Sequence, residues 1–220
     1  MIDQKFILLI FNCKKYKNKR EFQKKTWLRS LNNNILYYHI IGDSNKCKNK
    51  DYIFDNSNNI LYINVKDDYL SLPAKVIRAY KAINETFNYK YIFKTDDDQV
   101  LIKPKFFDTL MNVLNIKSNI NYGGIILDIK DHYSRWWVHH PELPKDLLLR
   151  ECSYAVGRFY LISNEVVDHL LKYRNEFEKT VIEDHSVGYF WRDKFDRSRC
   201  LKLDVESIFI DIERYLKLIK

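Results

Sequence analysis

Hydrophobic and polar positions divide the chain into short continuous apolar runs and longer stripes of helical period. Residues 6–11 are all apolar and are followed by Asn12, a pattern typical of a strand buried on both faces. Residues 35–41 and 61–65 are similar, and residues 89–95 form a run rich in aromatic and β-branched side chains. These runs predict the strands of a central sheet.

Apolar stripes at helical spacing lie between the strands. The clearest begins after Ser71, a helix-capping residue, and has Pro73 in its first turn. Its apolar positions are Leu72, Val76, Tyr80, Ile83 and Phe87. Further helices are predicted over residues 20–31, 105–115, 165–174 and 184–195, and further strands over 124–129, 154–163 and 203–210. The alternation of strands and helices predicts an α/β fold.

The 220 residues are 46% hydrophobic, which is enough for one domain with a sizeable core. Five glycines and four prolines give no linker or repeat, so we expect residues 1–220 to form a single domain. The four dispersed cysteines form no CxxC pair, which argues against a zinc site and predicts free thiols. The opening apolar run is too short to span a membrane, so the sequence as given predicts a cytoplasmic protein.

The net charge of +8 raises the question of nucleic-acid binding. The densest basic stretch, residues 14–29, also carries apolar residues at helical spacing, which is typical of a solvated helix face. We therefore expect no nucleic-acid partner. A diphosphate ligand requires much less positive charge.

Three adjacent aspartates directly follow the run at 89–95. Because alternate side chains of an extended backbone point to the same face, Asp96 and Asp98 should converge while Asp97 points away. Two convergent carboxylates favour a divalent cation, and oxygen ligands favour manganese or magnesium over zinc. An isolated triplet is more often a solvated turn. Its place at the end of a buried strand, where α/β proteins bind ligands, favours the site.

A second acidic pair, Glu183 and Asp184, opens the helix predicted near 184–195. The helix dipole stabilises carboxylates in a first turn, so Asp184 should be ionised at neutral pH and able to accept a proton. Alone, this pattern is more often an ordinary acidic helix start. The catalytic interpretation depends on both acidic motifs together.

At this point the sequence resembles glycosyltransferase family 31, the beta-1,3-galactosyltransferase and Fringe-like enzymes. Five segments are similar to the family's motifs in the family's order over roughly residues 5 to 195. They begin at Arg20 (R-x-x-x-K-x-T-W), Asp67 (D-x-Y-x-S-L-x-x-K), Lys94 (K-x-D-D-D), Arg135 (R-W-W-V, followed by Y-x-x-G-x-x-Y-x-x-S) and Glu183 (E-D-x-x-x-G).

The resemblance implies a GT-A fold, a Rossmann-like mixed sheet flanked by helices. It also implies an inverting hexosyltransferase that uses a UDP-sugar and manganese to form a beta-1,3 linkage on a glycan or glycoprotein. By this resemblance Asp98 binds the metal directly, and Asp96 contacts ribose or the metal-bound diphosphate and is a second candidate metal ligand. Asp184 is the catalytic base, Glu183 orients its loop, and Asp97 lies at the donor site.

Other matched residues carry weaker expectations. Lys75, Arg20 and Asp67 are candidates for contacts with the donor, although structural or solvated roles are equally compatible with the two cations. Trp136 and Trp137 are candidates for a platform under a sugar ring, with at most one of them at the site.

Two departures from the family pattern are evident. No His follows His185, whereas the family has a metal-binding His downstream of the E-D motif; Asp204, Asp211 or water are substitutes. The family's Golgi anchor is also missing from the given sequence. This predicts an anchorless cytoplasmic relative, as in a large DNA virus or a protist, or alternatively a clipped luminal domain.

Two other functions remain open from the sequence. A metal-dependent phosphohydrolase or nucleotidyltransferase would use the same acidic cluster and turn over nucleotides without a sugar acceptor. A degenerate transferase fold would bind a glycan or nucleotide without turnover.

Overall fold

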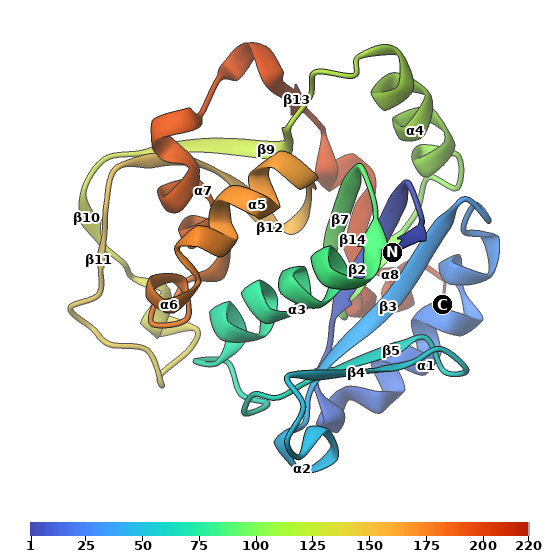
Figure 1. Cartoon of the computed structure of the whole chain (residues 1–220), viewed down its shortest axis with the longest axis horizontal. Helices are drawn as coiled ribbons and strands as arrows, with labels where there is room; N and C mark the ends of the chain where they lie inside the picture. The colour runs from blue at the N-terminus through green and yellow to red at the C-terminus, as the bar shows by residue number, and fades with distance from the viewer. Residues whose placement is uncertain (220) are drawn as a thin grey trace.

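The computed structural model describes residues 1–219, and its centre is one eight-stranded sheet (Figure 1). In spatial order its strands are β13 (Cys200–Lys202), β9 (Tyr122–Ile129), β12 (Cys152–Ser163), β7 (Tyr91–Asp96), β2 (Phe6–Phe11), β3 (Ile35–Gly42), β5 (Ile60–Ile63) and β4 (Tyr52–Asp55). The strands β7, β2, β3 and β5 are parallel neighbours, whereas β12 is antiparallel to both β7 and β9. The predicted mixed sheet is confirmed.

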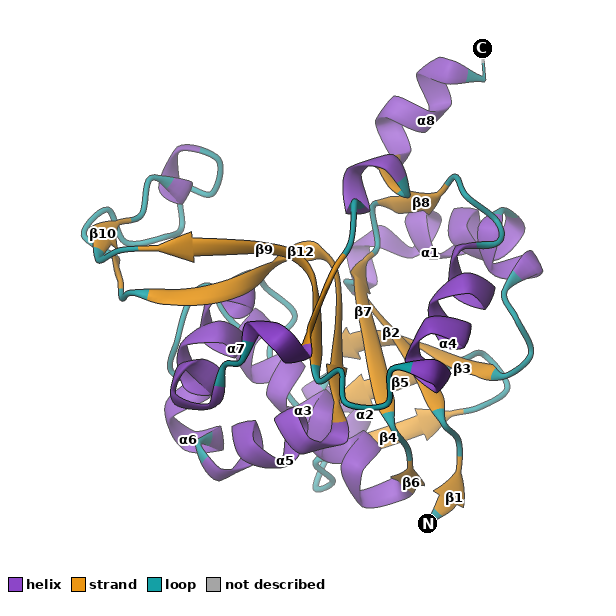
Figure 2. Cartoon of the chain, turned by 90° about the horizontal axis from the view of Figure 1, so that it is seen from above, coloured by secondary structure: helices purple, strands orange, loops and turns teal. Residues whose placement is uncertain are grey.

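Helices cover both faces of the sheet, as Figure 2 shows from above. One face carries α3 (Leu72–Thr86), α5 (Asn164–Lys172), α6 (Arg174–Phe177) and α7 (Glu183–Trp191). The other carries α1 (Lys17–Lys25), α4 (Phe106–Ile116) and α8 (Ile212–Leu218), and α2 (Ser44–Cys47) follows β3. This is the predicted GT-A arrangement of a sheet flanked by helices.

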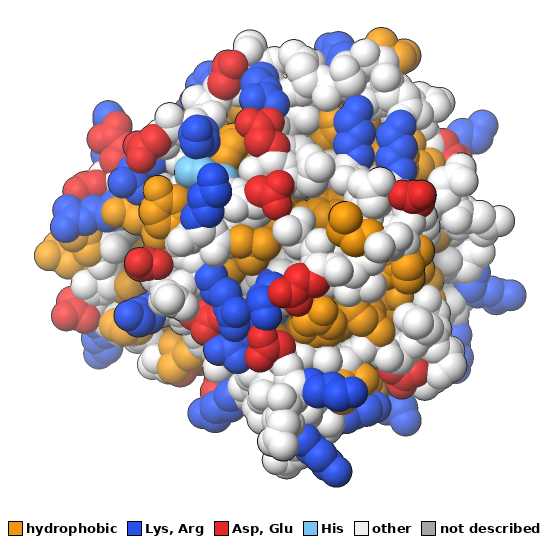
Figure 3. Space-filling view, in the orientation of Figure 1, with side chains coloured by type: hydrophobic (Ala, Val, Ile, Leu, Met, Phe, Trp, Pro, Cys, Tyr) orange, Lys and Arg blue, Asp and Glu red, His pale blue; other side chains and the backbone are white. Residues whose placement is uncertain are grey.

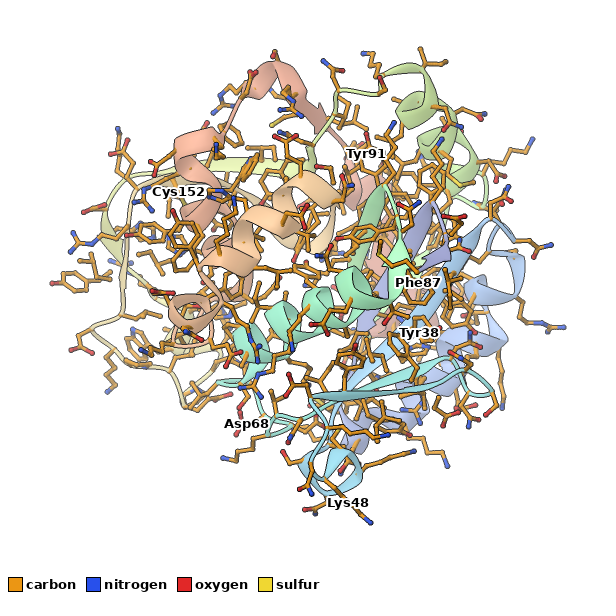
Figure 4. The ribbon with its side chains drawn as sticks, viewed as in Figure 1. Tyr38, Lys48, Asp68, Phe87, Tyr91 and Cys152 are labelled. Carbon is orange, nitrogen blue, oxygen red and sulfur yellow. The ribbon has the colours of Figure 1, made fainter. Side chains whose placement is uncertain are left out.

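Alternate side chains of β2 point to opposite faces of the sheet and belong to two separate hydrophobic cores. Ile7 and Leu9 face α3, α5 and α7, whereas Leu8 and Ile10 face α4 and the 3₁₀ turn η2 (Trp27–Ser30), all four side chains being fully buried. A strand that is buried on both faces must be apolar at every position, which explains the unbroken run at 6–11. In the first core Tyr38 lies beside Phe87, as Figure 4 shows.

Three smaller strand pairs surround the main sheet. They are β1 (Ile2–Asp3) with β6 (Phe87–Asn88), β8 (Gln99–Leu101) with β14 (Phe209–Asp211), and β10 (His132–Tyr133) with β11 (Leu148–Leu149). In Figure 2, β9 and β12 project beyond the body of the sheet as a two-stranded arm with β10 and β11 at its tip. The loop between β10 and β11 contains the 3₁₀ turn η3 (Trp136–Val138).

The helix predicted over 20–31 differs from the structure. The helix α1 begins earlier and ends before Thr26, whose hydroxyl donates to the carbonyl of Phe22. The chain then turns so that Trp27 packs against Phe107 and Phe209. Burial of this indole, whose nitrogen donates to the Gln99 carbonyl, requires the break in the helix.

The strand predicted over 203–210 is also wrong. The chain forms β13, the 3₁₀ turn η6 (Val205–Ser207) and then β14. Because β13 pairs with β9 while β14 pairs with β8, the chain must cross between two sheets and cannot remain a single strand.

The start of α3 differs in one detail. Ser71 precedes the helix but makes no side-chain cap hydrogen bond. Asp68 accepts from the Ser71 amide instead, at 2.9 Å, and Figure 4 labels it near the beginning of α3. Pro73 lies in the first turn as predicted.

Charged side chains are mixed on the visible face of the molecule. In Figure 3, lysines and arginines alternate with acidic residues and apolar areas. None of the helices within residues 1–219 combines the length and the apolar character that crossing a bilayer requires.

Candidate active site

The acidic triplet forms a tight turn between β7 and β8. Asp96 is the last residue of β7, and Asp97 and Asp98 make the turn. The Asp97 amide donates to the carbonyl of Phe11 at the end of β2. Gln23 of α1 donates to the carbonyls of Asp96 and Gln99 at 3.2 and 2.9 Å. The turn is therefore fixed at the carboxyl ends of β2 and β7.

The three carboxylates have different partners. Asp97 is 7% exposed and accepts from Asn12 at 2.9 Å and from Lys19 at 3.2 Å, so both of its oxygens have protein donors. Asp96 pairs with Lys94 at 2.8 Å, and Asp98 accepts from the Gln99 side chain at 2.8 Å. The protein therefore engages one oxygen each of Asp96 and Asp98 but both oxygens of Asp97.

Burial raises the pKa of two of these carboxyl groups. It raises the pKa of Asp96 to about 7 against the opposing effect of the Lys94 ammonium. It raises the pKa of Asp97 to about 6 against the effect of Lys19. Asp98 contributes to both increases, because neighbouring negative charges disfavour ionisation. A cation bound here would relieve this repulsion.

Lys94 connects the triplet to the second acidic motif. Its side chain is 1% exposed, and its ammonium contacts Asp96 at 2.8 Å, Glu183 at 3.2 Å and the carbonyl of Gly157 at 2.8 Å. Burial alone would lower the pKa of Lys94, but Asp96 and Glu183 raise it above the usual value. The other oxygen of Glu183 accepts from Tyr160, which fixes both ends of this buried carboxylate.

Asp184 lies in the first turn of α7 and is partly exposed. Its two oxygens accept from the amides of Gly157 and His185, at 2.9 and 2.8 Å. Burial raises the pKa of Asp184, against the effects of Lys94 and the two amides. The helix dipole alone predicts the opposite direction, so the surroundings of this carboxylate outweigh its position in the helix.

The close packing of α7 against β12 brings these groups together. A Cβ atom on Gly188 would lie 2.4 Å from the Ser153 carbonyl oxygen and 2.4 Å from the Tyr154 Cβ, which no side chain allows. In β12 the pairing with β9 shifts register between Ala155 and Tyr160. Gly157 lies in this irregular segment, where its carbonyl and amide are free to bind Lys94 and Asp184.

Lys75, Arg20 and Asp67 form a second buried network beside the first. Lys75 is 2% exposed and donates to Asp67 at 2.6 Å and to the carbonyl of Asn12 at 3.1 Å. Asp67 also accepts from the amides of Lys14 and Gly42. Arg20 is 8% exposed and donates to the Asn12 side chain. In this structure the three residues form hydrogen bonds that connect the loops around Asn12 to neighbouring strand ends.

Of the two tryptophans, Trp136 lies near the acidic residues. It is 47% exposed, and its indole nitrogen donates to the hydroxyl of Tyr69 at 2.7 Å. His140 stacks on the Tyr69 ring with centroids 3.9 Å apart. Burial raises the pKa of Tyr69 to about 12, and Asp184 is among the nearby carboxylates that add to this shift. Trp137 lies under Lys145 instead.

Two hollows lie away from the triplet, and one of them borders the start of α7 beside the second acidic motif. One of about 600 Å³ is at the amino end of β2 and is lined by Lys5, Asn32 and Asn115. The other, of about 230 Å³, is bordered by Leu148 and Ile182. The acidic site instead occupies the carboxyl ends of the parallel strands, where α/β proteins bind ligands.

Comparison with known proteins assigns the family. The profile of the galactosyltransferase family matches residues 18–198, most of the chain and both acidic motifs. The chain belongs to the galactosyltransferase family. The predicted membership in a glycosyltransferase family is thereby confirmed.

The similar proteins of known activity share only about a quarter of their aligned residues with this chain. The human UDP-GalNAc:beta-1,3-N-acetylgalactosaminyltransferase 2 is 26% identical over 142 residues, which cover 64% of the chain and 27% of the relative. The Xenopus laevis protein of the same name is 26% identical over 151 residues, covering 64% and 28%. The chain thus spans about a quarter of the length of these curated relatives.

Solved structures are similar to the chain at low identity. CMP:2-keto-3-deoxy-manno-octonic acid synthetase complexed with CTP has a TM-score of 0.50 and 10% identity, covering 98% of the chain and 96% of the synthetase. A glycosyltransferase involved in glycosylation of the major capsid of PBCV-1 has a TM-score of 0.49 and 9% identity, with 94% of each chain covered. The likeness to the synthetase concerns the fold alone.

The carboxylate oxygens at this site suit a magnesium or manganese ion that is held jointly with a substrate. Within residues 1–219 no group of three His, Cys, Asp or Glu side chains is arranged to hold a metal. Asp96 and Asp98 each keep one oxygen that accepts no hydrogen bond from the described residues. Such ions are commonly bound by one or two carboxylates together with substrate phosphates and water.

Asp211 and Asp204, the two candidate substitutes for the missing metal-binding His, lie in different places. The side-chain amide of Gln99 donates to both Asp98 and Asp211 at 2.8 Å, so Asp211 lies beside the triplet. Asp211 also pairs with Arg158 at 3.2 Å. Asp204 precedes η6, and within the described part of the chain no hydrogen bond or ion pair joins it to the triplet.

Sequence reasoning assigned no role to Lys94, Asn12 or Tyr160. A lysine inside the buried run at 89–95 is itself a signal, because buried cations require partners. Asn12 ends the run at 6–11, which hints at its place beside the site. Tyr160 is the second Tyr of the matched Y-x-x-G-x-x-Y segment, but an aromatic residue in a buried strand is usually core, so the pattern gave it no role of its own.

Proposed function

We propose that this chain catalyses inverting transfer of a hexose or N-acetylhexosamine from a UDP-sugar to a hydroxyl of a glycan or glycoprotein, forming a beta-1,3 linkage. The observation that carries the proposal is the joining of the two acidic motifs. Lys94 contacts Asp96 directly, and through Gly157 it is linked to Asp184. A metal-binding carboxylate and a base are the two groups that such a transfer requires.

In this proposal Asp98 and Asp96 hold a manganese or magnesium ion with their free oxygens. When bound, the ion supplies charge neutralisation for the diphosphate leaving group. Lys19 is a further candidate for contact with phosphate, because its ammonium is only partly buried and lies 3.2 Å from Asp97. Lys75 and Arg20, the other candidates for contact with the donor, donate to Asn12 in this structure.

Asp184 is the proposed catalytic base. The amides of Gly157 and His185 hold its carboxylate in a defined orientation, and its partial exposure lets an acceptor hydroxyl approach. A raised pKa makes it a stronger base than an ordinary aspartate, provided that it stays deprotonated at the working pH. Glu183 is buried with both oxygens engaged, so it is proposed to position neighbouring groups.

Trp136, Tyr69 and His140, here called the aromatic platform, are proposed to bind the acceptor. Flat aromatic faces stack on sugar rings, and the exposed indole of Trp136 contacts Tyr69, whose pKa the charge of Asp184 helps to raise. The names of the relatives, which specify UDP-GalNAc and a beta-1,3 linkage, support this donor class and linkage.

A titration with UDP tests the metal and donor assignment. The chain should bind UDP more tightly with manganese than without it, as measured by calorimetry. Asp98→Ala should lower the manganese-dependent part of the affinity at least tenfold while circular dichroism stays unchanged, because one of two carboxylate ligands is lost. Asp193→Ala, an exposed aspartate after α7, serves as the control.

Unchanged manganese-dependent affinity in a folded Asp98→Ala protein would disprove the metal assignment. A screen of nucleotide sugars with mass analysis of products then separates the candidate functions. Hydrolysis or nucleotide exchange without an acceptor would favour a phosphohydrolase or nucleotidyltransferase. Binding without any product would favour a degenerate module.

A further inference from the structure

We propose that Lys94 is a positioning residue that sets the metal-binding carboxylate and the base at a fixed separation. The inference rests on the proposed function and extends it. Lys94 comes from the interior of β7, but its ammonium reaches acceptors on three segments: Asp96 at the end of β7, Gly157 in β12, and Glu183 at the start of α7. The Lys94 ammonium therefore makes one hydrogen bond and two ion pairs.

The contact with Gly157 transmits the position of Lys94 to Asp184. The carbonyl of Gly157 accepts from Lys94, and its amide donates to Asp184 at 2.9 Å. The space at this residue is small: a Cβ on Gly157 would lie 3.3 Å from an Asp184 oxygen and 3.4 Å from the Lys94 nitrogen. A shift of the ammonium therefore moves the group that orients the base.

Glu183 connects Lys94 to buried tyrosine side chains of the core. One of its oxygens contacts Lys94, and the other accepts from Tyr160, whose hydroxyl also contacts that of Tyr80 at 2.5 Å. All of these side chains are buried, so each polar atom is held by a protein partner. These successive contacts hold Lys94 against the core between β12 and α3.

Removal of Lys94 alone would confuse two effects. It would leave the carboxylate of Glu183 buried without its counter-charge, which strongly destabilises a protein. The informative variant is therefore Lys94→Met combined with Glu183→Gln, which removes both members of the buried Lys94–Glu183 pair, whereas the Asp96 side chain is 36% exposed and keeps contact with solvent. Glu183→Gln alone is the matched control, because Lys94 then keeps its contacts with Asp96 and Gly157.

Two measurements decide the matter. Amide hydrogen exchange by NMR should show the Gly157 amide exchanging at least tenfold faster in the double variant than in the control, with core amides unchanged. Calorimetry should show manganese-dependent UDP affinity lowered about tenfold, and kcat for transfer should fall at least a hundredfold while KM for the acceptor changes little.

The inference is overturned if the folded double variant keeps the Gly157 protection and the kcat of the control, because Lys94 would then serve stability alone. Absence of manganese-dependent UDP binding in the parental chain would instead disprove the proposed function. The exchange comparison still decides whether Lys94 positions Gly157 and Asp184 in that case, since it requires no ligand.

Discussion

At the residue scale, two adjacent carboxylates in one helical turn have different surroundings. Glu183 is 4% exposed and is held by Lys94 and Tyr160. Asp184 is partly exposed and is held by backbone amides, which orient it without neutralising it. The position of each side chain on the helix decides this difference, because one faces the core and the other faces the strand ends.

Replacement of Asp184 by Asn should abolish transfer while leaving the donor site intact. Asn keeps the shape of Asp but cannot accept a proton, and removal of a general base lowers rates roughly a hundredfold or more. We expect kcat to fall by that factor, and UDP affinity with manganese to stay within about twofold of the parental value. Steady-state kinetics with calorimetry measures both.

Glu183→Gln serves as the comparison for Asp184→Asn. It keeps a hydrogen-bond acceptor for Tyr160 and should reduce kcat much less. A near-parental rate in Asp184→Asn together with an inactive Glu183→Gln would reverse the two roles.

At the element scale, the site depends on how α7, the arm and the η3 loop approach the sheet. Gly188 lets α7 lie directly on β12, which brings the start of the helix to the end of β7. The loop at the tip of the arm contains η3, and its Trp136 contacts Tyr69, which precedes α3. The acceptor side of the proposed site is thus built by segments distant from the triplet in sequence.

Trp136→Ala should weaken acceptor binding only. Loss of one stacking surface is worth roughly 1 kcal/mol, so KM for the acceptor should rise about fivefold to tenfold. UDP affinity should not change, because the aromatic platform does not include the triplet. Trp137→Ala is a matched control from the same loop, since its ring lies under Lys145. Equal effects of the two variants would argue against the platform.

At the scale of the whole molecule, one buried histidine links stability to pH. His39 of β3 is fully buried, and neither ring nitrogen has a hydrogen-bond partner within the described part of the chain. Burial lowers the pKa of His39 to about 3, and the cations of Arg20 and Lys24 contribute. The folded protein therefore keeps this ring neutral at pH values where the unfolded chain protonates it.

The direction of the pH effect follows from linkage. As pH falls below about 6.5 the unfolded state binds a proton that the folded state does not, so stability declines until about pH 3. At pH 4.5 the loss from this one group is roughly 3 kcal/mol. His39→Leu should remove that loss. Urea unfolding at pH 7.5 and 4.5 should show a smaller difference in the free energy of unfolding.

The exposed His132 provides the control for this experiment. His132→Gln should leave the pH dependence unchanged. An equally steep acid decline in His39→Leu would show that other groups, such as the buried carboxyls, account for it.

The sequence by itself determined most of the framework. Strands β2, β3 and β7 and helices α3 and α4 have strong apolar periods, because burial on one or two faces leaves a direct record in the residue pattern. The two acidic motifs were visible because they interrupt that pattern at strand and helix ends. The end of β13 at Lys202 and the start of β14 at Phe209 were not visible, because these boundaries depend on which strands the two elements pair with.

Only the tertiary structure decided how the site is assembled. It shows that Lys94 joins the two motifs, and that Lys75, Arg20 and Asp67 surround Asn12. It also reverses the expected direction of the pKa shift at Asp184, because burial acts more strongly than the helix dipole. Side-chain partners at the site come from segments up to 112 residues apart in sequence, and the local residue pattern does not reveal such contacts.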